Sequence, residues 1–373
     1  MLKENQFITL RLEKRKTMRT LFTIFALLLI TQAKAQFSDV ILGGSIHDAK
    51  KYTQSYLLPM EQGMAASASN GVINFTKSKR KISFNIGFHL SAALTPSSDR
   101  SFDINSLNLE EFIASDPNNT IAQSISGASQ SIGIETKETY YKPSIGIPPY
   151  KVVPVAQFDS PEGTGVPLSP VPEISVGIYG FGTHINATFL PSFNYSKEAT
   201  LYSYGFSLQH NLETYIKPMQ KWPVKLAIAG SYQYTLMEYH LDIQPDNTKI
   251  GIEIGAHNGP YDNQKMSIKL YSIPVQLIAY HDFNNLTLYA GAGYNMTRSE
   301  VALSGNFPVY VTDPSNQLKV LVEDVTDPFE YNRSFNHIRF DLGINYIVGF
   351  MKFKASYSYS NYQVFNIGLG VNI

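Results

Sequence analysis

The chain of 373 residues contains no cysteine. This absence excludes disulfide frameworks, thiolate metal sites, a cysteine nucleophile and the anchoring cysteine of a bacterial lipoprotein. An excess of charge is absent too, because 30 Lys and Arg residues balance 30 Asp and Glu residues. With no basic excess and no binding motif, nucleic acid is not expected as a partner.

The chain also lacks an apolar run of about 20 residues, the length that a membrane-spanning helix requires. The apolar run over residues 21–30 is half that length and precedes the small-x-small sequence Ala33-Lys34-Ala35. It follows four basic residues, Lys14, Arg15, Lys16 and Arg19. A basic stretch, a short apolar core and such a site make up an export signal. We therefore predict a signal peptide over residues 1–35, cleaved after Ala35.

Aromatic residues are abundant, with 24 Tyr and 22 Phe, while charged residues reach only 16%. This composition favours strands, and alternation of apolar and polar residues is the dominant pattern. It is cleanest over residues 82–95, 337–350, 351–360 and 363–373. Further strands are expected near residues 174–190, 202–216, 223–241, 265–281 and 286–304. We interpret changes of phase near Gly180–Gly182 and Ser272–Pro274 as β-bulges.

Alternation alone fits a soluble sandwich or a ligand-binding barrel as well as a membrane barrel. Strand length and the asymmetry of the connections favour the membrane, together with the export signal and the apolar alternation at the chain end. The runs are longer than the roughly 5–6 residues of globular strands, and a tilted spanning strand needs about 9–11. Short connections (217–223, 281–285) also contrast with long polar ones (191–200, 242–264, 305–336). The predicted fold is all-β: a transmembrane antiparallel barrel of about 10–14 strands, surrounded by outer-membrane lipid.

Residues 96–173 are too many for an ordinary connection. If the C-terminus is periplasmic, the strand count places this insert in the periplasm or the lumen, unless one strand has been overlooked. The predicted organisation is a signal peptide (1–35), an N-terminal plug or periplasmic segment (36–76), and a barrel (77–373) that contains the insert.

A helix is expected within residues 47–64, with Asp48 as N-cap and Pro59 kinking or ending it. It would place Tyr52, Tyr56 and Met60 on one side. These residues could belong to a plug that gates a small apolar solute. They could equally belong to a periplasmic helix packed across the barrel floor.

The polar faces of the strands supply candidates for the lining of the lumen. Charges of both signs could line a permeation path, or form the ion pairs that fill a narrow barrel. We favour ion pairs for any single residue. The candidates are His89, Arg339, Asp341, Asn345, Lys352, Lys354 and Asn366.

Enzymatic activity is not expected. A barrel acyl hydrolase needs Ser and His paired near the membrane rim. Only His210 stands out among eight histidines, because it falls on the apolar phase of its strand beside Ser207, and a rim position explains it. No nucleophile motif and no metal-ligand spacing is present, so no catalytic residue, metal or cofactor is predicted.

The ending "NIGLGVNI" resembles the C-terminal signal of outer-membrane barrels. Asn366, Gly368, Val371 and Ile373 carry this resemblance, and Ile373 replaces the usual terminal aromatic residue. The resemblance implies recognition by the barrel-insertion machinery, with the final strand closing the barrel.

The whole mature chain resembles an uncharacterised family of exported Gram-negative barrels that is distantly similar to the long-chain fatty-acid transporters. Residues 61–75, the strand end at Pro96 and residues 171–193 carry the resemblance. It implies passive passage of a small hydrophobic solute. The alternative is a structural or adhesive scaffold whose contacts come from residues 304–334, and an acyl hydrolase is a weaker third.

Overall fold

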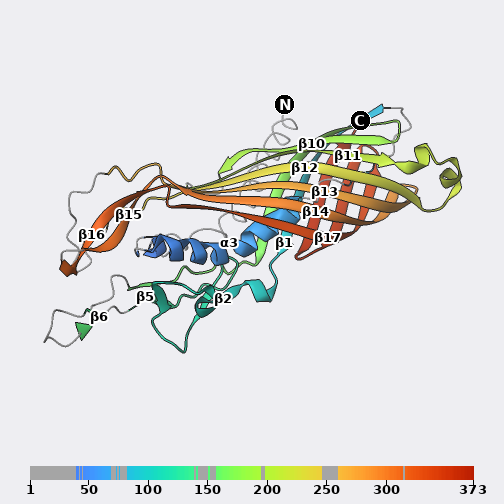
Figure 1. The fold of residues 1–373 in the computed structure, drawn as a ribbon. Helices are drawn as coiled ribbons and strands as arrows, with labels where there is room; N and C mark the ends of the chain where they lie inside the picture. Colours follow the sequence, from blue (N-terminus) through green and yellow to red (C-terminus); the bar gives the residue numbers. More distant parts are fainter. Residues whose placement is uncertain are drawn as a thin grey trace, which may run out of the picture.

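Ten long strands form a closed antiparallel barrel (Figure 1). The computed structural model describes residues 39–41, 43, 45–68, 73, 75, 82–137, 140–141, 150–151, 157–194, 198–245, 259–313 and 316–373. Around the wall the order is β1, β19, β18, β17, β14, β13, β12, β11, β10, β9 and back to β1. The bounds are β1 (Ile82–Leu94), β9 (Leu168–Gly180), β10 (Thr183–Asn194), β11 (Ala199–Asn211), β12 (Lys225–His240), β13 (Lys265–Phe283), β14 (Leu286–Ser304), β17 (Phe329–Val348), β18 (Met351–Tyr359) and β19 (Gln363–Asn372). The predicted fold class is confirmed, at the lower bound of the predicted strand number.

The barrel carries its apolar side chains on the outside. Phe84, Phe340 and Ile367 are 53%, 55% and 60% exposed, whereas their neighbours Asp341 and Asn366 are 2% and 1% exposed and point inward. A water-soluble barrel would reverse this arrangement, because a contiguous apolar exterior of this extent is unfavourable in water. The exterior is therefore a lipid-facing surface, and the soluble alternative is excluded.

One predicted bulge is a turn. Phe181 and Gly182 have positive φ angles of 51° and 76°, and they connect β9 to β10. The expected strand at 174–190 is thus two antiparallel strands, and one strand had been overlooked. This corrects the side of the insert, which lies at the same end of the barrel as the other long connections.

The two ends of the barrel differ. The C-terminal rim holds the C-terminus, the turns at 181–182, 284–285 and 349–350, and the connection 212–224, which contains the 3-10 turns η3 (Leu212–Thr214) and η4 (Lys217–Lys221). The opposite end, the long-loop rim, holds the insert, here residues 95–167, and the connections 241–264 and 305–328.

The second predicted bulge is also wrong. Ser272 and Pro274 pair with Thr297 and Asn295 of β14 in one continuous register. What changes near this point is the surroundings of the strand. Before Ser272 the inward residues are Met266, Ile268 and Leu270, and beyond it they include Gln276.

The same inversion occurs on four adjacent strands. We call residues 235–240, 265–270, 299–304 and 329–336 of β12, β13, β14 and β17, together with the insert and the elements packed on them, the outer tier. The rest of the barrel is the membrane tier. In β17, Phe329, Tyr331 and Phe335 point inward in the outer tier, while Arg339 and Asp341 point inward in the membrane tier.

Short strands build the rest of the outer tier (Figure 1). The hairpin of β15 (Asn306–Asp313) and β16 (Asn316–Thr326) forms its own two-stranded sheet. The insert contains η1 (Ser97–Asp99), β2 (Ser101–Asp103), η2 (Ile104–Leu107), β3 (Phe112–Ala114), β4 (Ile121–Gln123), β5 (Gly133–Thr136), β6 (Tyr140–Tyr141), β7 (Tyr150–Lys151) and β8 (Gln157–Asp159).

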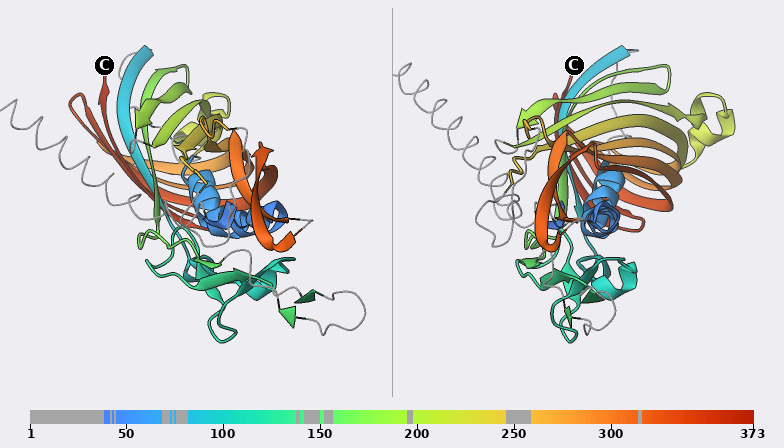
Figure 2. Two further views of the ribbon diagram at one scale, coloured as in Figure 1. Left: turned by 90° about the vertical axis from the view of Figure 1, so that its left-hand side faces the viewer. Right: turned by 60° about the vertical axis from the view of Figure 1, so that its left-hand side comes forward.

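The N-terminal helix α3 spans Ile46–Ala68. Its N-cap is Ser45, whose Oγ accepts a hydrogen bond from the Asp48 N–H at 3.2 Å, so the prediction of Asp48 as N-cap is wrong. Pro59 does not end the helix, which continues for nine residues to Ala68. Viewed from the long-loop rim, α3 lies between the barrel wall and the insert (Figure 2).

No helix among the described residues combines the length and the apolar character needed to cross a membrane.

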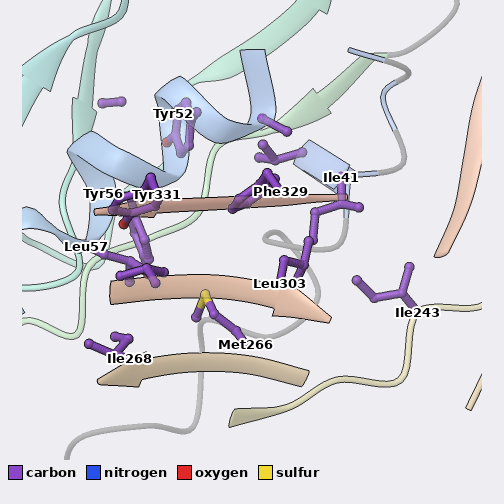
Figure 3. Packing of buried hydrophobic residues seen from close by; sticks show 14 of the residues in the cluster. Ile41, Tyr52, Tyr56, Leu57, Ile243, Met266, Ile268, Leu303, Phe329 and Tyr331 are labelled. Carbon is purple, nitrogen blue, oxygen red and sulfur yellow. The ribbon is translucent and has the colours of Figure 1, made fainter. Parts of the chain in front are cut away.

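One hydrophobic core joins α3, the insert and the outer-tier parts of β12, β13, β14 and β17, the four longest strands. Tyr52 of α3 packs edge-on against Phe102 of β2, with ring centroids 5.2 Å apart. Tyr56 and Leu57 face the inward residues of the long strands, among them Tyr331 (Figure 3). The insert therefore completes the outer tier on the side where β1, β18 and β19 are short.

Candidate functional site: a plugged lumen

The mouth of the lumen is closed by the C-terminal half of α3, where Glu61 is fully buried. The Ser299 hydroxyl donates to Glu61 Oε2 at 2.7 Å and the Tyr331 hydroxyl donates to Oε1 at 3.0 Å. Arg333 Nη1 lies 3.4 Å from the same Oε1. Burial raises the pKa of the Glu61 carboxyl, and these three partners lower it only in part.

Deeper in the barrel, the end of α3 touches two walls. Ser67 Oγ donates to the Ser169 carbonyl oxygen of β9 at 3.3 Å, and Asn295 Nδ2 of β14 donates to the Ala65 carbonyl oxygen at 3.4 Å. Gly63 approaches β9 so closely that a Cβ there would overlap Ser169. A glycine is what lets the helix enter the barrel at this depth.

Residues 73 and 75 fill the floor. The Phe75 ring lies 4.9 Å from Tyr280 and 5.3 Å from Tyr289, within a buried cluster that includes Ile73. Their backbones are held from the wall, because Lys354 Nζ donates to the Ile73 carbonyl at 2.7 Å and Asn345 Nδ2 donates to the Phe75 carbonyl at 3.4 Å. The N-terminal segment thus occupies the lumen at its mouth and at its floor.

A polar belt lines the wall between these two levels. Arg339 Nη2 lies 2.6 Å from Asp341 Oδ1 and donates to Ser358 Oγ at 2.9 Å. On the opposite strands, Gln233 Nε2 donates to Glu173 Oε1 at 2.6 Å. These side chains find room because glycines face them, so that a Cβ at Gly205 would overlap Gln233.

The structure places all seven predicted lining residues on the inner face of the barrel, each less than 10% exposed. Arg339 and Asp341 form an ion pair, as the structural alternative supposes. His89 Nε2 bonds to Ser175 Oγ at 3.0 Å, and Asn366 Nδ2 donates to Ser91 Oγ at 2.8 Å. Lys354 and Asn345 instead hold the plug, and Lys352 is buried on the same strand as Lys354.

The predicted plug residues lie elsewhere on α3 than the lumen contacts. Tyr52 and Tyr56 are buried in the outer-tier core, where the Tyr56 hydroxyl donates to the Glu162 carbonyl of the insert at 2.9 Å. Met60 is partly buried against the same core. Sequence reasoning missed Glu61, although it is the only charged residue between Lys51 and Lys77 and so marks a special position.

Asp48 fastens α3 to the insert. Its carboxylate accepts the backbone N–H groups of Glu110, Glu111 and Phe112 at 2.8, 2.7 and 2.8 Å. Charge-assisted bonds of this kind are the strong ones. Asp48 therefore holds the plug helix and the insert as one unit.

The last strand closes the barrel, since β19 pairs with both β1 and β18. Ile373 exchanges two backbone hydrogen bonds with Phe84. Gly368 is required by space, because a Cβ there would overlap His89. Recognition of Asn366, Gly368, Val371 and Ile373 by the insertion machinery stays a prediction, and the signal peptide lies outside the described residues.

The part of the chain that the structure describes holds no group of three or more His, Asp or Glu side chains placed to bind a metal ion. His210 lies at the C-terminal rim, where its Nδ1 bonds to Thr183 Oγ1 at 2.8 Å and its ring contacts Tyr215. Its partners are therefore a threonine and a tyrosine of the rim.

Solved structures with some likeness to the chain are membrane barrels. The translocator domain of autotransporter NalP from Neisseria meningitidis is 11% identical, with 83% of this chain and 92% of that chain covered and a TM-score of 0.31. Ail, the attachment invasion locus protein of Yersinia pestis, is 8% identical over 78% and 97%, with a TM-score of 0.24. Likenesses this weak carry no functional argument, and the assignment of the barrel rests on its strands and exterior. No curated protein matches the chain.

The predicted similarity to the fatty-acid transporters stays a prediction. The family model that matches is DUF6588, a family of unknown function, and the match covers residues 15–373, almost the whole chain. The chain belongs to this family, DUF6588.

Proposed function

We propose that the protein is an outer-membrane barrel closed by its own N-terminal segment, and that it acts by holding the folded outer tier at the cell surface. The plugged lumen carries this proposal, because α3 occupies the mouth and residues 73 and 75 occupy the floor. A structural or surface-contact role needs no open channel. The outer tier, one core with α3, offers a rigid surface for such contacts.

In this proposal the long-loop rim faces the outside, because outer-membrane barrels have short periplasmic turns and long external loops. The absence of cysteine makes the orientation easy to test. Asn118→Cys in the insert and Asn285→Cys at the C-terminal rim each add one exposed thiol. A membrane-impermeant maleimide should label Asn118→Cys on intact cells, and Asn285→Cys only after permeabilisation. The reverse pattern would end the surface-contact proposal.

Passage of a small solute is the second candidate. One observation favours it: the mouth and the floor of the lumen are closed by the N-terminal segment, which is not part of the barrel wall, so both ends can open without breaking the barrel. The polar belt argues against a strongly hydrophobic cargo on this route. An apolar solute gains nothing from Arg339, Asp341 and Glu173, and would have to displace buried hydrogen bonds.

A disulfide that ties α3 to the barrel wall, and that can be reduced again, distinguishes the two candidate functions. An ideal Cβ at position 63 lies 3.6 Å from the Ala93 Cβ of β1, within the roughly 3.5–4.5 Å of disulfides. The variant Gly63→Cys/Ala93→Cys/Ser169→Gly places two thiols there and removes the side chain that would clash. The same variant with Ala93 retained is the control, because it cannot be locked.

Solute uptake into proteoliposomes is then measured before and after reduction of the disulfide. If the surface-contact proposal is correct, neither the locked nor the reduced variant takes up solute, and the unmodified protein does not either. Uptake that appears only after reduction would support solute passage with a moving plug. Equal uptake in the locked and reduced states would contradict both, since solutes would then pass a closed lumen.

A further inference from the structure

The connection 212–224 at the C-terminal rim exposes an unusual number of apolar side chains. Tyr215, Trp222 and Val224 are 75%, 53% and 46% exposed, and Ile216 is 43% exposed. The connection is nevertheless folded: η3 and η4 form two 3-10 turns, and Met219 is only 4% exposed and anchors them from within. A loop exposed to water would bury such residues or replace them with polar ones.

Two rim histidines fix the connection to the lipid-facing side of the wall. The His210 ring lies 5.1 Å from Tyr215, and His281 Nδ1 hydrogen-bonds to the Pro223 carbonyl oxygen. His210 lies on the outward phase of β11, in line with Leu208 and Phe206, which face lipid. Tyr215 therefore continues the lipid-facing surface.

The acidic side chain of the connection points the other way, into the barrel. Tyr280, an inward residue of β13, donates its hydroxyl proton to Glu213 Oε1 at 2.5 Å, so the acidic group is turned toward the barrel interior. Lys221 is exposed beside Trp222. An aromatic ring next to an exposed lysine is typical of the boundary between acyl chains and phosphate headgroups, where the ring is half buried and the amine reaches the phosphates.

The position along the barrel agrees with this boundary. At the other side of the membrane tier, Tyr204, Tyr234 and Tyr271 lie in one row on three adjacent strands, with ring centroids 5.1 and 5.2 Å apart. The stretch from Val224, at the end of the connection, to Tyr234 of β12 has the length of a tilted spanning strand, about 9–11 residues.

We infer that the connection 212–224 is a lipid-binding element that inserts Tyr215, Ile216 and Trp222 into the headgroup boundary of the leaflet at the C-terminal rim, and so fixes the depth of the barrel. Its ligand is phospholipid, because the exposed apolar side chains of the connection continue the lipid-facing surface of the wall. In the proposed orientation this is the periplasmic leaflet.

Trp222 is the only tryptophan in the chain, so its fluorescence reports this element directly. The full-length protein is folded into vesicles of phosphatidylethanolamine and phosphatidylglycerol that carry a nitroxide near the headgroup or deep in the acyl chain. We expect blue-shifted emission, stronger quenching by the shallow nitroxide than by the deep one, and loss of most acrylamide quenching relative to free tryptophan.

Two variants calibrate the depth. Trp222→Phe/Leu208→Trp places the probe on the lipid-facing wall and should be quenched best by the deep nitroxide. Trp222→Phe/Glu330→Trp places it on the outer tier and should respond to acrylamide alone.

A response of Trp222 like that of the outer-tier variant would overturn the inference, because the element would then lie in water. Shielding of Trp222 from acrylamide in native membranes but not in vesicles would also overturn it, since the occupant would then be a protein.

Discussion

The strands β12, β13, β14 and β17 turn their apolar side chains outward in the membrane tier and inward in the outer tier. In β17 the side chains of Phe340 and Leu342 face lipid and Asp341 faces the lumen, whereas further along Tyr331 faces the core and Asn332 faces water. Strand geometry is the same in both tiers, and the surroundings of the wall change on both sides. The membrane tier has lipid outside and polar side chains inside, whereas the outer tier has water outside and an apolar core inside. An apolar residue therefore faces outward where the solvent is lipid and inward where it is water.

The two tiers also differ in what fills the barrel. Ten strands enclose little space, and in the membrane tier polar side chains fill it as hydrogen-bonded pairs. In the outer tier the wall is open on the side of β1, β18 and β19, so α3 and the insert supply the missing layer. The helix α3 therefore both closes the mouth of the lumen and belongs to the hydrophobic core of the outer tier.

The largest effect is expected from a cavity in the outer tier. Phe112→Ala removes a ring that is 1% exposed and packs edge-on against Phe158 at 5.5 Å. The change should cost the outer tier about 3–5 kcal/mol. Limited proteolysis of the insert in vesicles measures this. Phe340→Ala, on the lipid-facing wall, is the control and should leave the insert resistant, and equal sensitivity in both variants would contradict a separate outer-tier core.

A charge on the exterior should distinguish the tiers next. Leu342 is 60% exposed and lies near the middle of the lipid-facing part of β17. Leu342→Arg should destabilise the barrel by about 2–4 kcal/mol, because the guanidinium enters the hydrocarbon. Asn332→Arg, outward on the same strand in the outer tier, should change stability by less than about 0.5 kcal/mol. Urea unfolding from vesicles measures both, and similar costs would mean that lipid does not surround the membrane tier.

Loss of the Asp48 carboxylate, which connects α3 to the insert, should destabilise the outer tier less. Asp48→Asn replaces a carboxylate that accepts three backbone N–H groups. Bonds to charged groups contribute about 1.5–3 kcal/mol, and we expect a loss in this range. Faster hydrogen exchange at the amides of Glu110 and Phe112 would report it. The matched control is Glu110→Gln, an exposed side chain paired with His47, and it should leave those amides protected.

The smallest effect concerns Glu61 and depends on pH. Burial raises the pKa of its carboxyl above the ordinary value of 4.5, so the folded plug binds a proton more tightly than the unfolded chain. The stability of the plug should therefore fall as pH rises from about 4.5 through the raised pKa.

Glu61→Gln should remove this dependence and leave the plug at least as stable at neutral pH. Hydrogen exchange of α3 measured across pH 4–8 tests the prediction. Ser299→Ala, which removes one donor to Glu61, serves as the comparison and should raise the pKa of that carboxyl further. A pH dependence that Glu61→Gln leaves unchanged would show that another group controls the plug.

The alternation of apolar and polar residues predicted some strands correctly and misled at two positions. The alternation in 82–94 and 363–372 predicted the outward faces of β1 and β19, because both strands lie wholly in the membrane tier. At Ser272–Pro274 the same method failed, since the polarity changed while the register did not. At Phe181–Gly182 a two-residue turn resembled a bulge in a sequence that stays apolar on both sides.

The sequence by itself determined the class of the protein, because a period of two with uncharged apolar faces allows a stable strand only where one side meets lipid or a core. Tertiary structure alone decided where lipid ends and the outer-tier core begins, on which rim the insert lies, and that α3 closes the lumen. These features depend on which residues meet across the barrel, such as Glu61 with Ser299 and Asp48 with the backbone at 110–112. Contacts between residues so far apart in the chain leave no local pattern to read.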